Sequence, residues 1–455
     1  MKNLLSILVL IFVAGCASVK PKMSSDPKHL WRPIKTVESS LDLQQPLFTT
    51  EGVYTLPSLL ELGLSKNPKT RAAWWQAKKA LARTGRTKSQ FLPSISANIN
   101  ANRVQTGTVL NQPSSKVDNW GPGLKISYCL FQFGAGIADA KSAACALEAA
   151  NYTFNHTLQS VVFEIQSNYY NYASAVATIE ACKNSLEDAE ASFKAVENRM
   201  NNGLARTQDL LLAKADKLQA AYELQSAQAN LEHYRAELAL SVGVPVSKDF
   251  KVDVTFNETN KLTEEVETLM EKALKARADI LAQEASVKAT NWSYKKAQSE
   301  ALPKIEFSGS TNALRYSKDA HWQKNYTLGV GVVWNLFDGF DKQYKELEAY
   351  SAMKSQLFDL HQQQLQVLRD VWSEFHTFQS SVQLLDSAKA LEAAATESLA
   401  SIRIGYDAGL NSLLDLLSAQ KTLSEARLKR IRSQSNLATH WAKLAYVTGR
   451  LESEK

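Results

Sequence analysis

The sequence predicts a mainly α-helical chain with a transmembrane β-barrel, made of two duplicated halves that together supply four strands and two long helical hairpins. Three observations predict this fold class. Short motifs of the first half recur in the second half. Two stretches in each half alternate polar and apolar residues. One stretch in each half is compatible with a single, exceptionally long helix.

The two halves share motifs at a nearly constant spacing. Leu130-Phe131 recurs as Leu336-Phe337, and Gly203-Leu204 recurs as Gly409-Leu410, in both cases 206 residues later. Upstream of these motifs the spacing is 210 residues, because Leu92-Pro93 recurs as Leu302-Pro303. A period of about 200 residues is far too long for a solenoid repeat, whose units have roughly 20 to 50 residues. We therefore predict a duplicated structural half.

This duplication divides the chain into six predicted segments. They are a signal peptide at 1–15, an acylated extended segment at 16–55, a first repeat at 56–243, a mid-height linker at 244–262, a second repeat at 263–449 and a tail at 450–455.

The N-terminus has the pattern of an exported lipoprotein. Lys2 precedes about ten apolar residues, which are too few to span a bilayer and are typical of a signal-peptide core. The following Val13-Ala14-Gly15-Cys16 resembles a bacterial lipoprotein box, in which Cys16 would be acylated and become the first mature residue. Ala17 stands where a retention aspartate would keep such a protein in the inner membrane, which indicates the outer membrane. An ordinary signal peptide with an incidental cysteine is the alternative.

Composition and motifs argue against several classes of protein. Apart from Cys16, three cysteines remain, an odd number that gives no disulfide framework, and none has zinc-ligand spacing. The net charge of +6 is spread over the helical regions, and the basic stretches lack interleaved aromatics, which argues against nucleic-acid binding. We find no nucleophile, metalloprotease or phosphate-loop motif. We therefore expect that the protein is not an enzyme and that it binds no metal and no cofactor.

Four stretches have the alternation of half-buried strands. The first half has them at about 94–103 and 123–131, and the second half at about 304–312 and 326–334, with a polar loop containing Gly121 and Pro122 before the second stretch. Strands of about nine to eleven residues cross a bilayer at a tilt. Tyr128 and its repeat partner Trp334 are predicted to lie at a strand end and to form an interfacial aromatic girdle. A soluble sheet packed on helices would show the same alternation.

The helical stretches exceed what one globular core can cover. Residues 135–199 and 341–403 contain no proline and, beyond position 136, no glycine. At 1.5 Å per residue such a helix reaches about 100 Å, so it must run along a tube or a coiled coil. Each stretch ends at a glycine turn, with tips expected near 200–209 and 404–415.

The number of strands predicts that the chain pairs with other copies of itself. Four strands cannot close a barrel, and an open edge in hydrocarbon costs several kcal/mol for each unpaired backbone group. If the strands enter a membrane, the protein must oligomerise, and three chains would supply twelve strands.

The order of these motifs resembles one family. Leu-Pro precedes each first strand, Leu-Phe follows each second strand, and Gly-Leu-x4-Asp-Leu marks each hairpin tip. Over residues 56–451 the chain is similar to the TolC-family outer-membrane efflux proteins, in the acylated branch that serves multidrug and metal export. The resemblance implies a homotrimer that forms a twelve-stranded barrel in the outer membrane and an α-helical tunnel in the periplasm. It implies no catalysis.

The resemblance also implies roles for residues at the hairpin tips. Asp209 and Asp415 match positions whose carboxylates narrow the periplasmic entrance, and Tyr406 matches a gate aromatic that bridges to the neighbouring hairpin. Both aspartates also fit helix capping, with Thr207 and Ser412 as expected N-caps. Asn411 and Ser418 depart from the pattern, since the best-known member carries an arginine of the gate network and a second acidic ring there.

The partners follow from the same resemblance. Gly203-Leu204 and Gly409-Leu410 would meet a periplasmic adaptor, which joins the channel to an inner-membrane pump, with the RND type favoured and the ABC or MFS type possible. We expect a lipid-anchored outer-membrane exit duct with a large periplasmic extension, which contacts outer-membrane lipid and exports small molecules. The outer-membrane component of a type I protein secretion system is one alternative, and a non-channel coiled-coil lipoprotein is the other.

Overall fold

The computed structural model describes residues 53–107, 115–246, 251–254, 264–316 and 321–449. The predicted signal peptide, Cys16 and the C-terminal tail lie outside the described residues, as does most of the predicted linker. The chain forms two compact units. The sheet unit contains the described residues of 76–151 and 282–361, and the hairpin unit contains those of 53–75, 152–281 and 362–449.

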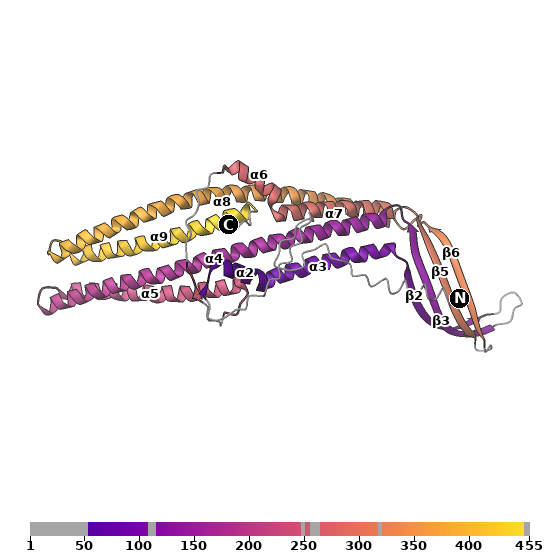
Figure 1. The fold of residues 1–455 in the computed structure, drawn as a ribbon, viewed down its shortest axis with the longest axis horizontal. Coiled ribbons are helices and arrows are strands. Elements are labelled where there is room, and N and C mark those ends of the chain that lie inside the picture. The colour runs from indigo at the N-terminus through magenta and orange to yellow at the C-terminus, as the bar shows by residue number, and fades with distance from the viewer. Residues whose placement is uncertain (1–52, 108–114, 247–250, 255–263, 317–320, 450–455) are drawn as a thin grey trace. The chain divides into compact units, whose positions relative to one another are not determined.

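The two halves have the same order of elements (Figure 1). The first half consists of α2 (Leu56–Lys66), α3 (Pro68–Lys88), the short 3-10 helix η1 (Ser89–Phe91), β2 (Ser94–Thr106), β3 (Ser115–Phe131), α4 (Ala135–Asn201) and α5 (Thr207–Val242). The second half consists of α6 (Val266–Ala276), α7 (Ala278–Glu300), β5 (Lys304–Tyr316), β6 (Trp322–Val333), α8 (Asp341–Asp407) and α9 (Leu413–Val447). Two short strands, β1 (Val53–Tyr54) and β4 (Lys251–Val252), pair in parallel.

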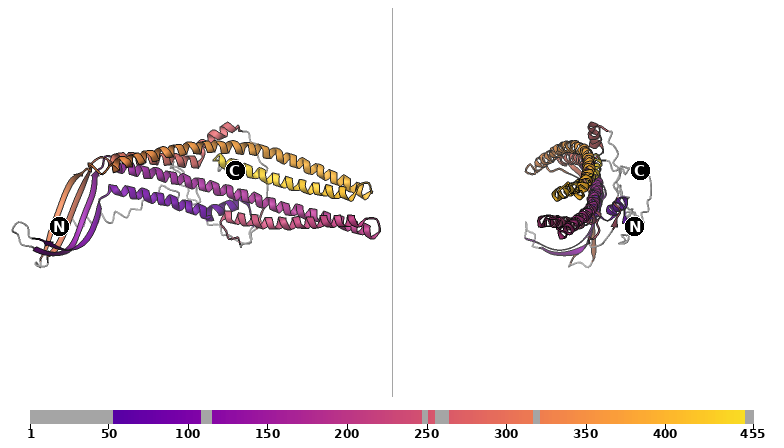
Figure 2. Two further views of the ribbon diagram at one scale, coloured as in Figure 1. Left: turned by 180° about the vertical axis from the view of Figure 1, so that it is seen from behind. Right: turned by 90° about the vertical axis from the view of Figure 1, so that its left-hand side faces the viewer.

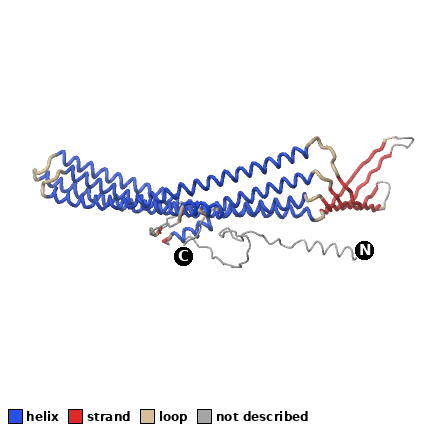
Figure 3. Tube along the Cα trace, turned by 90° about the horizontal axis from the view of Figure 1, so that it is seen from above, coloured by secondary structure: helices blue, strands red, loops and turns tan. Residues whose placement is uncertain are grey.

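The sheet unit is built around one antiparallel sheet, whose strands are drawn in red in Figure 3. Its strand order is β2-β3-β5-β6. Each strand joins a helical segment at the same end of the sheet, because β2 and β5 follow helices and β3 and β6 precede them. Strands β2 and β6 lie at the edges, with one neighbour each among the described residues. The strands have 12 to 17 residues and are therefore longer than the expected nine to eleven.

The expected loop around Gly121 and Pro122 is wrong, because both residues lie inside β3. Pro122 has no N–H for a ladder, and the pairing of β3 with β5 passes from Trp120 opposite Arg315 directly to Gly123 opposite Asn312. A Cβ at position 121 would lie 1.8 Å from the carbonyl oxygen of Ala313. Glycine and proline, which usually mark a loop, here mark a close approach of two backbones within a strand.

The helical segment that precedes each pair of strands is interrupted once, between α2 and α3 in the first half and between α6 and α7 in the second. The first breaks at Asn67 before Pro68, since a proline disfavours helical backbone in the preceding residue. The second breaks at the corresponding Arg277 without a proline. Asn67 Nδ2 donates to the carbonyl oxygen of Ser241 at 2.6 Å, and Arg277 Nη1 donates to that of Val447 at 3.3 Å. The residue at each break therefore binds the C-terminal end of the second hairpin helix of its half, which is α5 for Asn67 and α9 for Arg277.

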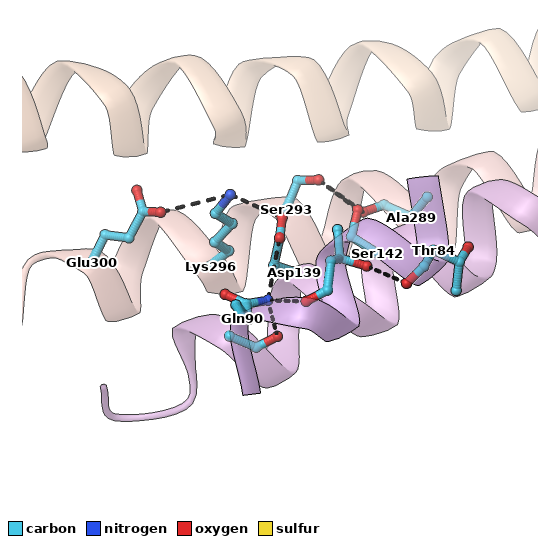
Figure 4. Close-up of polar contacts among 10 residues, drawn as sticks. Thr84, Gln90, Asp139, Ser142, Ala289, Ser293, Lys296 and Glu300 are labelled. Atoms are coloured by element: carbon cyan, nitrogen blue, oxygen red, sulfur yellow. Dashed lines mark hydrogen bonds and ion pairs between the residues drawn. The ribbon is translucent and has the colours of Figure 1, made fainter. Parts of the chain in front are cut away.

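Polar contacts join three helices of the sheet unit (Figure 4). Thr84 Oγ1 of α3 donates to the carbonyl oxygen of Ala143 on α4 at 3.1 Å. Helix α4 also contacts α7, where Lys296 Nζ lies 2.9 Å from Asp139 Oδ1 and Ser142 Oγ lies 2.8 Å from Ser293 Oγ. The small serine and alanine side chains allow close helix approach, which explains why these helices are rich in Ser and Ala.

The described residues of the hairpin unit form two buried clusters. One surrounds Tyr169, whose hydroxyl donates to the carbonyl oxygen of Asp253 at 2.8 Å, and it includes Leu59, Ile165 and Leu238. The other joins all four helices of the two hairpins through residues such as Val196. Seen end-on, these helices follow an arc (Figure 2, right).

A buried ionic cluster links α8 to α9. The Glu374 carboxylate, with only 4% of its side chain exposed, lies 2.7 Å from His440 Nδ1 and 2.7 Å from Lys443 Nζ. Burial alone would raise the pKa of Glu374, but the hydrogen bonds from His440 and Lys443 outweigh it, and the pKa lies below the ordinary value. This cluster keeps a charge in the interior without leaving it unpaired.

None of the helices in the described part of the chain is long and apolar enough to cross a membrane.

Candidate functional site

The four-stranded sheet has one apolar and one polar face. The register places opposite residues of all four strands in rows, and successive rows point to opposite faces. One row consists of Ile95, Ile126, Gly309 and Leu328. The next row consists of Ser96, Lys125, Ser310 and Thr327.

The apolar face is uncovered in the single chain. On β6, four apolar side chains that point to it are between 65% and 80% exposed. They are Tyr326, Leu328, Val330 and Val332. Exposed apolar patches of this extent require a cover of lipid or protein. The polar face is rich in serine, asparagine and glycine, which suits contact with water.

Aromatic side chains lie near both ends of the apolar face. At the end joined to the helices, Tyr128 pairs with Phe307, and Phe131 packs edge-on against Phe133 with ring centroids 4.7 Å apart. Trp334 lies one residue beyond β6, where its indole N–H donates to the carbonyl oxygen of Ala301 at 3.3 Å. The predicted girdle partners therefore differ in position, since Tyr128 lies within β3 and Trp334 lies outside β6.

The sequence analysis missed a second aromatic pair at the far end of the same face. Trp120 and Trp322 lie on β3 and β6, and their ring centroids are 5.2 Å apart at an interplanar angle of 74°. Trp120 falls in the expected loop, and Trp322 precedes the expected start of its strand, so neither was assigned to a sheet. The signal for this pair is the alternation of polar and apolar residues in β3, which continues through Gly121 and Pro122.

The two hairpin tips have nearly identical backbone geometry. At the first tip, Gly203 has a φ of +74°, its N–H donates to Met200 O, and the N–H of Leu204 donates to Arg199 O. At the second tip, Gly409 has a φ of +76°, with the equivalent hydrogen bonds to Tyr406 O and Gly405 O. These are Schellman motifs, in which glycine provides the left-handed backbone.

The leucines after these glycines point into solvent. A Schellman motif usually packs this residue against the preceding helical turn. Here Leu204 is 76% and Leu410 is 83% exposed. The backbone turn alone does not need a leucine at either position, so another contact must account for it.

Asp209 and Asp415 both occupy the third position of their helices and accept from the N-cap backbone. Asp415 Oδ2 accepts from the N–H of Ser412 at 2.9 Å and from Ser412 Oγ at 2.7 Å. Asp209 Oδ2 accepts from the N–H of Arg206 at 3.2 Å. The expected N-cap Thr207 is wrong, because the repeat spacing places Arg206 opposite Ser412 and Thr207 is the first residue of α5. Arginine has no acceptor atom, so only the second hairpin has a complete capping box.

The capping geometry also sets the charge of Asp415. The hydrogen bond from the Ser412 hydroxyl, followed by that from the Ser412 N–H, lowers the pKa of Asp415 below its ordinary value. The carboxylate therefore stays ionised at neutral pH.

Tyr406 lies between the two hairpins. Its ring faces Arg199 at the end of α4, with 4.8 Å from the guanidinium carbon to the ring centroid, which is within the range of a cation–π contact. Asn411 Nδ2 donates to the carbonyl oxygen of Ile402 at 3.2 Å and lies against Gly405, where a Cβ would be 2.4 Å from that nitrogen. Asn411, in the loop between α8 and α9, thus stabilises the end of α8.

Two further contacts hold the hairpins together. Ser185 Oγ donates to Ser424 Oγ at 3.0 Å, and Gln420 Nε2 donates to Ser192 Oγ at 3.0 Å. Both join α4 to α9. Within the described part of the chain, no group of His, Cys, Asp and Glu is arranged to hold a metal ion.

A two-faced sheet with open edges, attached to long helical hairpins, defines a class of protein: the subunit of an oligomeric membrane channel. The sequence profile of the family described as "Outer membrane efflux protein" matches residues 59–244 and 269–450. The chain belongs to this family. The two matched segments coincide with the two structural halves.

Individual relatives are distant but match over most of their length. The pyoverdine export outer membrane protein OpmQ of Pseudomonas aeruginosa is 22% identical over 449 residues, which cover 94% of this chain and 92% of the relative. The probable outer membrane lipoprotein SilC of Salmonella typhimurium is 22% identical, with 92% of each chain covered. The Campylobacter jejuni CmeC outer membrane channel has a similar structure, with a TM-score of 0.79, 18% identity and coverage of 88% of this chain and 87% of CmeC.

Family membership confirms the predicted fold class as a mainly helical, duplicated channel fold with a small antiparallel sheet. The protein is the outer-membrane channel of a tripartite efflux system, and it is not an enzyme. The family implies a trimer that works with an adaptor and an inner-membrane pump.

The capping analysis makes a prediction about the two tips. Replacing Ser412 by Ala removes the hydroxyl that accepts from Asp415 N–H and donates to its carboxylate. Hydrogen exchange in the first turn of α9 should become about fivefold faster. The lowered pKa of Asp415 means that this turn is stabilised at neutral pH and loses that contribution as the pH falls through the pKa in the folded protein. In the variant that pKa is higher, so the loss should begin at a higher pH.

The matched control is Thr207→Ala at the start of α5, measured by hydrogen exchange and mass spectrometry. Because Thr207 is not the N-cap, exchange there should not change. Equal acceleration at both tips would contradict the assignment of Arg206 as the N-cap.

Proposed function

We propose that three copies of this chain close a twelve-stranded barrel whose apolar face contacts lipid and whose polar face surrounds a water-filled exit duct. The observation that carries this proposal is the row-by-row separation of apolar and polar residues across all four strands. In hydrocarbon the free edges of β2 and β6 would each cost several kcal/mol per unpaired group. Pairing β6 of one chain with β2 of the next removes both edges.

We further propose that the duct exports small molecules and that an RND-type pump supplies the energy. An acyl chain on Cys16 would attach each subunit to the outer membrane. Support comes from the lipoprotein box and from SilC, whose name also describes a lipoprotein. The name of OpmQ describes the export of pyoverdine, and this chain matches 92% of OpmQ.

The periplasmic entrance is proposed to be narrowed by Asp209 and Asp415. Both lie at the tip of a hairpin, and three chains would bring six carboxylates toward one axis. Such a ring attracts cations, and its side chains narrow the entrance. The contact of Tyr406 with Arg199 joins the two hairpins of one chain, and we propose that it holds the closed entrance.

Removing the carboxylates tests the entrance. In planar bilayers the double variant Asp209→Ala with Asp415→Ala should have a higher conductance and a weaker cation preference, because a charged constriction has been relieved. Conductance and reversal potential are measured in the same experiment. The control removes the same number of carboxylates from exposed positions of α8, with Asp359→Ala and Asp386→Ala, and should leave the conductance unchanged. Native conductance and selectivity in the tip variant would count against this constriction.

Leu204 and Leu410 are proposed to contact the adaptor. The double variant Leu204→Asp with Leu410→Asp places a charge where an apolar contact is expected, so drug export should be lost while trimer levels in the outer membrane stay normal. Export is measured as drug resistance of cells that depend on this channel. The control, Asn202→Asp with Ala408→Asp, adds the same charge at the same tips and keeps both leucines. If both variants export normally, the leucines are not an adaptor contact.

A further inference from the structure

The end of the apolar face that lies away from the helices carries a basic and aromatic group of side chains. We call it the rim cluster and define it as Trp120, Arg315, Trp322 and Lys324. The register places Trp120 and Trp322 on either side of Arg315 in one row. Lys324 pairs with Ala313 in the next row of the same face. All four side chains are exposed.

The two tryptophans lie over the strand between them. Trp120 and Trp322 belong to β3 and β6, which are separated by β5, and yet their ring centroids are 5.2 Å apart. The rings therefore lean toward each other across the position of Arg315. Tryptophan at the boundary between an apolar surface and water is typical of the headgroup level of a membrane.

The two positive charges of the rim cluster differ in their pairing from the charge of Arg103. Arg103, on the same face, forms a two-pronged pair with Asp118 at 2.6 and 2.9 Å and is thereby neutralised. Among the described residues, no Asp or Glu lies within ion-pair distance of Arg315 or Lys324. These two residues are diagonal neighbours on adjacent strands, with Cα atoms roughly 7–8 Å apart. Like charges at this spacing repel, so an anion between them would be stabilising.

At the level of the rim cluster, the positive charge lies on one face of the sheet. At the same level, the polar face carries the pairs Asn312 with Asn325 and Leu314 with Gln323, which are uncharged. A basic residue that served only solubility would have no reason to prefer the apolar face. The lysine stem can lie along that face while its ammonium reaches the headgroup level.

We propose that the rim cluster binds the phosphate groups of a phosphorylated glycolipid in the outer leaflet of the outer membrane. This inference rests on the proposed function, because it needs the apolar face in lipid and the helices on the periplasmic side. Arg315 offers a planar fork that suits a phosphate, and Lys324 adds a second positive charge beside it. The two indole rings provide an amphipathic surface for the sugar.

The experiment uses the full-length trimer in phosphatidylethanolamine vesicles that contain either bisphosphorylated lipid A or the same lipid without its phosphates. Lipid retained by the extracted trimer is measured by mass spectrometry at low and high salt. The native protein should retain the phosphorylated lipid preferentially. Arg315→Gln should weaken this retention about fivefold, and Arg315→Gln with Lys324→Gln about 25-fold at low salt. Arg315→Lys should restore part of it.

The matched control is Lys125→Gln, which removes one positive charge from the polar face of the same sheet and should not change retention. Equal retention of the two lipids by the native protein, or an equal loss in Lys125→Gln and Arg315→Gln, would overturn the proposal. Conductance of the same vesicles separates the two levels of inference. A native protein that inserts and conducts without phosphate preference refutes only the rim cluster, whereas one that does not insert refutes the proposed function as well.

Discussion

The unpaired edges of the four-stranded sheet are the constraint on which the rest of the structure depends. One face of this sheet is apolar in every strand, and an apolar face in lipid leaves the N–H and C=O groups of β2 and β6 without water. Only neighbours of the same kind can satisfy both edges at once. In the proposed barrel, a closed ring of subunits pairs both edge strands before any contact between helices is considered.

The duplication also determines how the helices are held. Because each half supplies one strand pair and one hairpin, the contacts that fix a hairpin must form twice. They do so with different residues: Asn67 and Arg277 each bond the last turn of the returning helix of their half, one with an amide and the other with a guanidinium. The tips show the same relation, since Arg206 and Ser412 are both N-caps but only the serine can accept a hydrogen bond. The two halves therefore share backbone conformation at these positions, whereas the side chains that stabilise it differ.

The sequence was sufficient to predict the duplicated halves, the strand pairs and the glycine turns, because period-2 alternation and left-handed glycines have strong local signatures. It was not sufficient where tertiary contact overrides local propensity. Gly121 and Pro122 predicted a loop, yet a strand passes through them because two backbones approach closely there. Treating them as a loop also hid Trp120, one half of the far aromatic pair. Thr207 has the propensity of an N-cap, but the turn geometry gives that position to Arg206.

The orientation of the sheet is tested most directly by spin labels at successive positions of β6, in a protein whose other cysteines are replaced, within lipid vesicles. Labels at Leu328 and Val330 should be relaxed by dissolved oxygen, which concentrates in hydrocarbon. Labels at Gly329 and Gly331 should be relaxed by a water-soluble nickel complex. A strict alternation between the two behaviours is the result expected for a wall with lipid on one side and water on the other. Equal accessibility to the nickel complex at all four positions would contradict it.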